Sequence, residues 1–510
     1  MTLPQHAWGG GVRVPRHKNL SNTGASRVPP LPARLIYPLR SHIGTAARPI
    51  IKPGERVLRG QCLAQPDTYV SQALHAATSG VVRDIGDFPV APGDITATCI
   101  VIEVDGEGRS VDPWPPLSAD ADGDAIQRRL VEAGVIGMGG AGFPSHVKVR
   151  EGLTRTVQTL IINGVECEPY ITCDDRLMRE HATGIVAGAR WLKRAVNAGE
   201  CFIAVEEDMP EALAALQSHA GEDVTVGSVP AIYPAGGEKQ LIKMLTGREV
   251  PSKGLPIQAG VLMHNVATAQ AVYQAVVEGR PLMSRYVTVT GSVQQPGNWQ
   301  ALLGTPVSHL LQQSGWGGYG KQQVIMGGPM MGMALSHLEV PVTKVTNCLL
   351  VQEAARVSMM SMPCIRCGEC LRVCPVQLNA RALYEYARAG DLDAAQDLHL
   401  FDCIECGACA YVCPSHIPLV SYYRQAKAGI AATERRQQTA AENRRRYERH
   451  EQRLAADQTA PETAESASPA GTMDKEAMRA EITAAVERVR AKRAANEPPD
   501  PTNGGESGAA

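Results

Sequence analysis

Apolar residues occur in short runs separated by turn residues between about residues 41 and 115. Val57 follows the Pro53-Gly54 turn and Val81 follows Gly80, so we expect strands to begin after these turns. The stretch TCIVIEV adds a further apolar run. The pattern predicts a β domain over residues 41–115, preceded by an irregular Pro/Gly/Arg-rich segment over residues 1–40.

This β domain resembles the barrel-sandwich hybrid of biotinyl and lipoyl carriers. Those carriers present a modifiable lysine at a hairpin tip, whereas the corresponding stretch here, residues 66–79, contains no lysine. We therefore interpret the domain as structural, because a fold by itself does not fix a function.

Helical periodicity replaces the strand pattern from about residue 120. Apolar residues at helical spacing over residues 125–133 predict a helix that Gly134 ends. Residues 159–166 (TLIINGVE) predict a strand, and helical stretches of alternating character follow. The alternation predicts an α/β domain over residues 120–285.

Residues 286–304 (YVTVTGSVQQPGNWQALLG) predict a hairpin that opens a small β-rich, β-grasp-like domain over residues 286–350. Within it, residues 326–335 (MGGPMMGMAL) predict a glycine-rich turn packed under methionine rather than a ligand site. An α-helical module is predicted over residues 355–425. The fold class is therefore multi-domain, with α/β and β parts.

The composition shifts beyond about residue 430, where charged residues dominate. The stretch ERRQQTAAENRRRYERHEQR predicts a solvent-exposed helix that continues from the preceding module. Residues 455–472 and 495–510 cannot bury enough apolar surface to become ordered, so we expect a charged, partly disordered tail over residues 430–510. Residues 476–495 can form a lone helix, either solvated or docked on a partner.

The overall charge gives the chain no attraction to nucleic acid or to anionic lipid. Lys and Arg number 50 and Asp and Glu number 52, a net charge of -2 over 510 residues. No run of 18 apolar residues occurs, and the N-terminal residues lack the apolar region of a signal peptide. We expect a cytoplasmic protein whose membrane association comes from its partners.

Eight cysteines fall into two copies of the pattern Cys-x2-Cys-x2-Cys-x3-Cys-Pro. In two-cluster ferredoxins this spacing places three thiolates around one [4Fe–4S] cubane and the fourth on the partner cluster. The first predicted ligand set is Cys364, Cys367, Cys370 and Cys413. The second predicted set is Cys374, Cys403, Cys406 and Cys409.

The alternatives fit this cysteine pattern less well. A zinc ribbon needs two Cys-x2-Cys pairs at a longer interval and has no trailing proline. A disulfide framework belongs to short secreted chains. Buried free cysteine is a common small hydrophobic residue, so we assign no ligand role to six others. These are Cys62, Cys99, Cys167, Cys173, Cys201 and Cys348.

A glycine-rich loop follows the first predicted helix of the α/β domain. Gly137, Gly139 and Gly142 match G-x-G-x-x-G, but a true dinucleotide fingerprint follows a strand directly. The loop can still cradle phosphates, because backbone N–H groups without side chains approach an anion closely. Lys148 is either a phosphate partner or a solvated surface lysine.

The chemistry of the two kinds of site narrows the ligand. A nicotinamide donates two electrons together as hydride, whereas a cubane accepts one electron at a time. A chain that joins a nucleotide loop to clusters therefore needs a flavin between them, because flavins handle both modes. We predict non-covalent FMN in the loop, with NADH as the substrate stacked above it.

Several motifs now resemble known families. GMGGAGFPSHVK (137–148) resembles the flavin and NADH loop of the NADH-oxidising subunit of complex I, and INGVECEP, YPAGGE and HNVAT follow in that family's order. Together with the N-terminal barrel, the hairpin domain and the double ferredoxin motif, residues 35–425 resemble the C subunits of the Rnf ion-translocating complexes.

The resemblance implies roles for the matching residues. For FMN it implies contacts with the phosphate, ribityl chain or flavin from Gly137, Gly139, Gly140, Gly142, Lys148, Asn163, Gly236, Asn265 and Thr268. For NADH it implies contacts from Phe143, Glu168 and Glu238. The chain departs from the complex I pattern at Met138, Val165, Gly237 and His264, which removes charge and hydrogen bonds near the flavin.

The resemblance also implies a function and partners. The implied function is that of an electron-input subunit, which passes electrons between NADH and ferredoxin or flavodoxin while other subunits move Na+ or H+. The implied location is the cytoplasmic face of the inner membrane. Two alternatives remain. One is a soluble NADH diaphorase that feeds another redox enzyme, and the other is a non-catalytic iron–sulfur relay whose flavin site has decayed.

Overall fold

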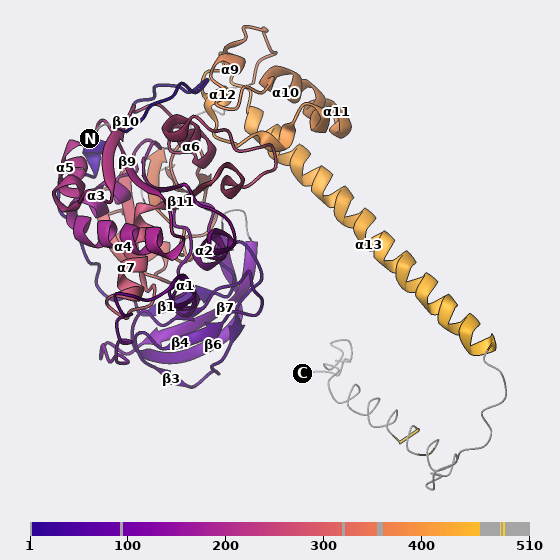
Figure 1. The fold of residues 1–510 in the computed structure, drawn as a ribbon, viewed down its shortest axis with the longest axis horizontal. Coiled ribbons are helices and arrows are strands. Elements are labelled where there is room, and N and C mark those ends of the chain that lie inside the picture. Colours follow the sequence, from indigo (N-terminus) through magenta and orange to yellow (C-terminus); the bar gives the residue numbers. More distant parts are fainter. Residues whose placement is uncertain are drawn as a thin grey trace, which may run out of the picture. The chain divides into compact units, whose positions relative to one another are not determined.

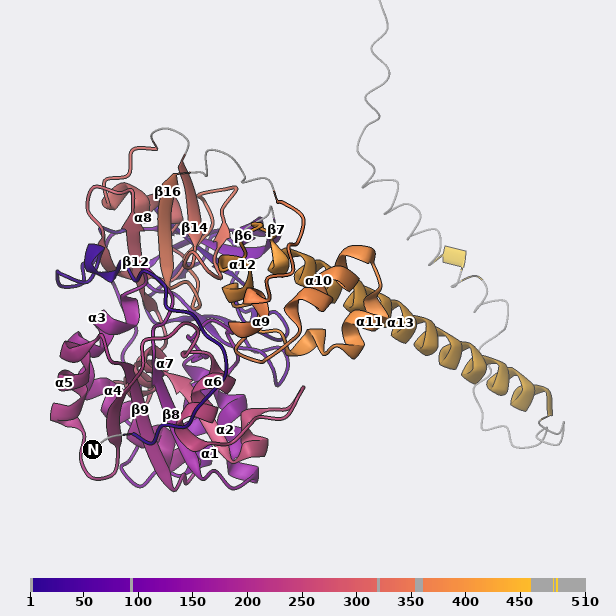
Figure 2. The ribbon, with the colours of Figure 1, turned by 90° about the horizontal axis from the view of Figure 1, so that it is seen from above.

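The computed structural model describes residues 3–91, 95–318, 322–353 and 361–459, together with residues 480, 483 and 484. The chain divides into two compact units, residues 1–432 and residues 433–510, and each is described by itself. Figures 1 and 2 show the fold, and the first unit contains the four domains predicted over residues 41–425 and the cysteine motifs.

Two small antiparallel sheets form the N-terminal β domain. The first has the strand order β1-β7-β6-β3 and the second β2-β4-β5. Apolar residues of both, such as Leu35, Leu63 and Ile100, are fully buried. The strands are β1 (Arg34–Pro38), β2 (Arg48–Pro49), β3 (Arg56–Val57), β4 (Cys62–Gln65), β5 (Leu74–His75), β6 (Gly80–Ala91) and β7 (Ile95–Val104).

The prediction of an irregular segment over residues 1–40 is wrong for Arg34–Pro38. This stretch is strand β1, which pairs with β7 so that Leu35 lies opposite Ile102. The pairing partner lies more than sixty residues further along the chain, and the apolar run of β1 is too short to predict a strand by itself. A 3-10 turn, η1 (Lys18–Leu20), also interrupts the segment.

A parallel sheet with the strand order β10-β9-β8-β11 is the centre of the α/β domain (Figure 1). Its strands are nearly continuous apolar runs because both faces of the sheet are covered. Leu160 and Ile162 of β8 lie in one core with helices α1, α4 and α7, while Ile161 packs with α6 on the opposite face.

The elements of this domain follow one another in the predicted α/β manner. The strands are β8 (Thr159–Gly164), β9 (Glu200–Glu206), β10 (Thr225–Val229) and β11 (Val261–Asn265). The helices are α1 (Gly123–Glu132), α2 (Ser145–Thr154), α3 (Cys173–Glu180), α4 (Ala182–Ala195), α5 (Pro210–His219), α6 (Glu238–Thr246), η2 (Pro256–Ala259) and α7 (Val266–Val276). The predicted helix over residues 125–133 and the strand over residues 159–166 are confirmed as α1 and β8.

The hairpin prediction is confirmed by β12 (Ser284–Gly291) and β13 (Gly297–Leu302), which pair antiparallel. They belong to a mixed sheet with the strand order β13-β12-β16-β14-β15, and helix α8 shares its core. The remaining elements are α8 (Val307–Gln313), β14 (Gln322–Met326), β15 (Met333–Ala334) and β16 (Cys348–Glu353).

Short helices build the part of the chain that carries the cysteine motifs, residues 361–432, called the cluster module below. Its elements are α9 (Glu369–Arg372), α10 (Ala380–Ala389), α11 (Leu392–Asp397), η3 (Leu400–Asp402), α12 (Ala408–Tyr411) and the first turns of α13 (Leu419–Thr459). Gly368 and Gly407 precede α9 and α12 with φ of +81° and +80°, a conformation that glycine adopts without strain. The sequence duplication is therefore a structural duplication.

Helix α13 continues into the second unit, where its described side chains, up to residue 455, are exposed or half-buried. This agrees with the predicted solvent-exposed charged helix. The predicted helix over residues 476–495 lies outside the described residues except at positions 480, 483 and 484. In the described residues no helix is long and apolar enough to cross a membrane.

Candidate functional site

The parallel sheet has one position where the chain reverses the direction in which it adds strands. Strands β9 and β10 extend the sheet on one side of β8, and β11 lies on the other side. Ligands of open α/β sheets bind outside the carboxyl ends of the strands at such a switch point. Asn163 ends β8, Asn265 ends β11, and the two are direct neighbours in register.

The glycine loop lies over this end of the sheet. Ile136 and Pro144 bridge the base of the loop, and the Gly137 N–H donates to the carbonyl of Phe143 at 2.7 Å. A Cβ on Gly139 would lie 3.3 Å from the Cβ of Asn265, so the loop packs directly on the end of β11.

Gly140 is the open point of the loop. Its φ is +115°, and a Cβ there would have no neighbour within 4 Å. Helix α2 begins at Ser145 immediately after the loop, and its amino end adds a partial positive charge. Exposed backbone in front of open space, next to a helix amino terminus, fits the phosphate end of FMN.

Thr268 supports the loop from below. Its side chain is fully buried, its hydroxyl accepts from the Met138 N–H at 3.0 Å, and it donates to the Ile136 carbonyl at 3.2 Å. Arg285, which the motifs did not indicate, donates to the Met138 carbonyl at 2.9 Å. The Thr268 hydroxyl thus holds the loop in place, and its expected contact with FMN stays a prediction.

Lys148 and Glu238 lie together at the same edge. The Lys148 ammonium is 2.7 Å from a carboxylate oxygen of Glu238 at the start of α6, and it donates to the Met263 carbonyl at 2.9 Å. Next to it, His264 is buried, and burial together with the Lys148 charge lowers the pKa of His264 to about 3. The imidazole at this position is therefore neutral.

Asn163 and Asn265 make hydrogen bonds that hold the neighbouring backbone in place. The Asn163 amide donates to the Gly236 carbonyl at 2.9 Å, and a Cβ on Gly236 would lie 2.3 Å from the Val165 carbonyl oxygen. Asn265 caps α7 by accepting from the Ala267 N–H at 2.8 Å. The Asn163 contact fixes the turn after β8 against the turn before α6, and the Asn265 cap fixes the start of α7.

Glu168 does not face the glycine loop. Its carboxylate accepts from the N–H groups of Met330 and Met331 at 2.6 and 3.0 Å, in the methionine-rich turn of the neighbouring β-rich domain. Burial raises the pKa of Glu168. The Glu168 contact joins two domains, and the turn at residues 326–335 is part of that junction. The expected contact of Glu168 with the dinucleotide stays a prediction.

A buried cluster of polar side chains lies next to β8, and the sequence motifs did not indicate it. Glu166, Cys173 and Asp174 offer ligand atoms within 4.8 Å of one another, and Glu166 accepts from the Asp174 N–H at 2.9 Å. Burial raises the pKa of Glu166 to about 7, and Lys18 lies 3.5 Å from its carboxylate. Lys18 lies 148 residues before Glu166, so no local pattern indicates this pairing.

The eight motif cysteines line two separate cavities. Cys364, Cys367, Cys370 and Cys413 line one, called the outer set below. Cys374, Cys403, Cys406 and Cys409 line the other, called the inner set. The structure brings together the two predicted ligand sets, with one cysteine exchanged between the motifs, and four thiols around one cavity fit a cubane cluster.

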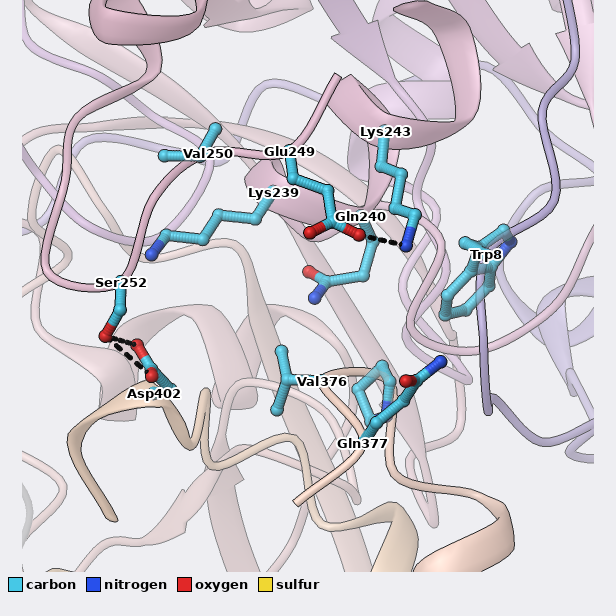
Figure 3. Close-up of a pocket in the computed structure, with 11 residues that line it drawn as sticks. Trp8, Lys239, Gln240, Lys243, Glu249, Val250, Ser252, Val376, Gln377 and Asp402 are labelled. Atoms are coloured by element: carbon cyan, nitrogen blue, oxygen red, sulfur yellow. Dashed lines mark hydrogen bonds and ion pairs between the residues drawn. The ribbon is translucent and has the colours of Figure 1, made fainter. Parts of the chain in front are cut away.

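A larger cavity of about 250 Å³ separates the α/β domain from the cluster module (Figure 3). Lys239 and Gln240 of α6 line one side, and Val376 and Gln377 of the cluster module line the other. Where the two sides meet at its edge, the Ser252 hydroxyl donates to the Asp402 carboxylate at 2.7 Å. None of the predicted ligand residues lines this cavity.

Comparison with known proteins places each part of this geometry in a family. Four family models match: the RnfC barrel sandwich hybrid domain at residues 6–107, the Nuo51 FMN-binding domain at 130–274, the SLBB domain at 286–334 and the 4Fe-4S dicluster domain at 360–417.

Similar relatives carry one common name, the C subunit of an ion-translocating oxidoreductase complex. The relative from Rhodobacter capsulatus is 41% identical over 77% of this chain and 77% of its own length. That of Pectobacterium atrosepticum is 43% identical over 95% and 71%. The chain belongs to the family of C subunits of ion-translocating oxidoreductase complexes.

The chain spans only 52–65% of the length of three of these relatives. The Pseudomonas aeruginosa protein is 44% identical over 78% of this chain, and the chain spans 52% of that relative. Among solved structures, an NAD+-reducing [NiFe]-hydrogenase in the H2-reduced state matches with a TM-score of 0.45 at 22% identity, covering 62% of this chain and 64% of that one.

The family models settle the cofactor classes of this chain. The FMN-binding model covers the glycine loop and both asparagines, and the dicluster model covers both cysteine motifs. FMN and [4Fe–4S] clusters are thus the cofactors, as the cysteine spacing and the hydride argument predicted. The barrel-sandwich resemblance is confirmed by the model over the N-terminal β domain.

Proposed function

We propose that this chain is the electron-input subunit of a membrane-bound complex that couples electron transfer between NADH and ferredoxin to the movement of Na+ or H+. The observation that carries the proposal is the presence, in one compact unit, of an open glycine loop at a sheet switch point and of two four-cysteine cavities. The common name of the relatives supports the coupling to an ion.

The α/β domain would bind and orient the nucleotides. The loop backbone at Gly139 and Gly140, the start of α2 and the Lys148 ammonium form the phosphate end of the FMN site. Phe143, half-buried beside the loop, and Glu238 at the start of α6 would receive NADH. When bound, FMN supplies the exchange between a two-electron hydride and single electrons.

The electron count fits two acceptor sites. One NADH gives one hydride and becomes NAD+, and the hydride carries two electrons and one hydrogen nucleus, which is released as a proton. The outer and inner sets would each hold a cubane, and a bound cubane would accept one electron. The two electrons of one hydride would therefore match the capacity of the two cysteine sets, and single electrons would leave toward ferredoxin, flavodoxin or another subunit.

We further propose that the chain lies peripherally on the cytoplasmic face of the inner membrane, held there by the other subunits. Its near-zero net charge gives no attraction to anionic lipid, so protein contacts would provide the attachment. The coupling ion and the direction of flow depend on those subunits.

The test is NADH oxidation by the full chain after anaerobic reconstitution with iron, sulfide and FMN. We expect NADH-dependent reduction of ferricyanide that requires FMN, and a saturable FMN titration monitored by flavin fluorescence. A cluster-loaded chain that binds no FMN would instead support the non-catalytic relay. Met138 and Val165, which replace polar residues of the complex I pattern, are buried in the core here and leave the loop backbone open.

A further inference from the structure

The two cysteine sets have different surroundings. In the outer set, Cys364 and Cys367 are exposed, and the neighbouring Met362 and Ile365 are 59% and 68% exposed. In the inner set, Cys406 is only 7% exposed. One set is thus open to solvent, while the other is covered.

The cover comes from the α/β domain. The Tyr233 hydroxyl donates to the carbonyl of Cys406 at 2.5 Å, and Tyr233 is only 1% exposed. Tyr233 and Val14 share an apolar core with Cys406 and Ala408. The tyrosine ring and its hydrogen bond thus join the α/β domain directly to the loop that carries an inner-set cysteine.

Tyr233 is also joined to the switch point of the sheet. It lies three residues before Gly236, whose carbonyl accepts the 2.9 Å hydrogen bond from Asn163 at the end of β8. A path of one short backbone segment and two hydrogen bonds therefore leads from the sheet edge to Cys406. Electron transfer slows steeply with distance, so such a short connected path favours the inner set as the nearer acceptor.

Two further segments contact the loops that carry the inner-set cysteines. From the N-terminal segment, the Gly11 N–H donates to the Val373 carbonyl at 2.9 Å, and a Cβ on Gly10 would lie 2.3 Å from the carbonyl oxygen of Cys374. From the methionine-rich turn, the Met330 carbonyl oxygen lies 2.8 Å from where a Cβ on Gly407 would be. Close contacts of backbone with backbone leave this side of the module little freedom to shift.

We propose that the inner set is the first acceptor of electrons from the α/β domain, that the outer set receives them from the inner set and passes them out of the chain, and that Tyr233 is the positioning residue of the first step. This order rests on the proposed function. The electron balance is unchanged, because each set gains and loses one electron at a time. The exposed face around Cys364 and Cys367 is then where the next one-electron carrier approaches.

The order is tested with two double variants of the full chain, each missing one cluster. Cys364→Ser with Cys367→Ser removes the outer cluster and leaves all four inner ligands. Cys403→Ser with Cys409→Ser does the reverse. Each FMN-loaded protein is reduced with NADH, with light and EDTA as a second donor to the flavin, and with dithionite. Flavin absorbance and cluster EPR are followed in time.

We expect the chain that keeps only the inner cluster to show a cluster signal with either flavin-dependent donor. The chain that keeps only the outer cluster should show its signal with dithionite and lose the flavin-dependent one. Equally fast flavin-dependent reduction of both would overturn the order, as would an inner cluster that stays oxidised beside reduced flavin. Flavin that light reduces but NADH does not would count against the proposed NADH activity alone.

Tyr233→Phe tests the positioning role without removing the ring. Loss of one hydrogen bond of about 1 kcal/mol shifts the equilibrium between the docked and undocked Cys406 loop about fivefold, so we expect cluster reduction to slow by up to that factor while flavin reduction and iron content stay unchanged. Tyr423→Phe is the matched control, because the buried Tyr423 lines the inner cavity and its hydroxyl donates within the cluster module, to the Ala380 carbonyl at 2.5 Å. Equal effects of the two substitutions would contradict a special role for Tyr233.

Discussion

Gly140→Ala isolates the contribution of the loop backbone to FMN binding. Gly140 has a φ of +115° and faces open space, so an added methyl group meets no protein atom within 4 Å. The methyl group would instead occupy the space in front of the loop, where the phosphate is expected. The substitution therefore changes two things, the strain of the backbone and the access to its N–H groups.

The two effects have separate magnitudes. Backbone strain at a positive φ costs about 1–3 kcal/mol of stability in an L-residue. A hydrogen bond to a charged group contributes about 1.5–3 kcal/mol, so the loss of one loop N–H contact would weaken FMN binding about 10- to 100-fold. Gly54→Ala is the matched control, because Gly54 has a φ of +88°, also faces open space and lies in the N-terminal β domain.

The assay pairs an FMN fluorescence titration with thermal unfolding of the FMN-free chain. We expect both variants to unfold at a lower temperature by a similar amount, and only Gly140→Ala to lose FMN affinity. An unchanged FMN affinity in Gly140→Ala, beside a normal loss of stability, would refute the assignment of the loop as the phosphate site. A loss of affinity in Gly54→Ala would show that strain alone explains the result.

Three further predictions concern charge and metal. Lys148→Met should weaken FMN binding in the same titration, whereas Lys243→Met should leave it unchanged, because Lys243 of α6 pairs with Glu249 instead of Glu238. Lys344 is buried and donates to the Ala73 carbonyl at 2.9 Å, and burial lowers its pKa to about 7 from 10.5. Because the unfolded chain binds the extra proton between these values, stability should rise by a few kcal/mol from pH 7 to 10.5, and urea unfolding of Lys344→Met should lack this rise. Anaerobic reconstitution should give about eight irons per chain by metal analysis, and zinc in their place would contradict the cluster assignment.

Local patterns predicted those parts of the structure whose partners lie nearby in the chain. The α1 helix ends at the glycine that follows it, and the β12–β13 hairpin closes over a few residues. Strand β1 was missed because its partner β7 is distant. In the candidate site, the motifs did not indicate the direction in which each side chain points.

Glu168 and Thr268 illustrate that limit. Both occur in motifs that resemble nucleotide sites, yet Glu168 holds the turn at Met330 and Thr268 holds the loop at Met138. Whether a polar side chain faces a ligand or a neighbouring backbone depends on what packs around it. That packing joins residues more than a hundred positions apart, beyond the reach of any local pattern.

The amino-acid sequence by itself determined the composition of the two cysteine sets, because the ligand spacing is local and the second motif repeats the first. Only the tertiary structure decided which set is covered by the α/β domain and which is open to solvent. The contact of Tyr233 with Cys406 spans 173 residues and depends on the docking of whole domains. Docking is the sum of many weak contacts between distant segments, and so it shows only in the folded chain.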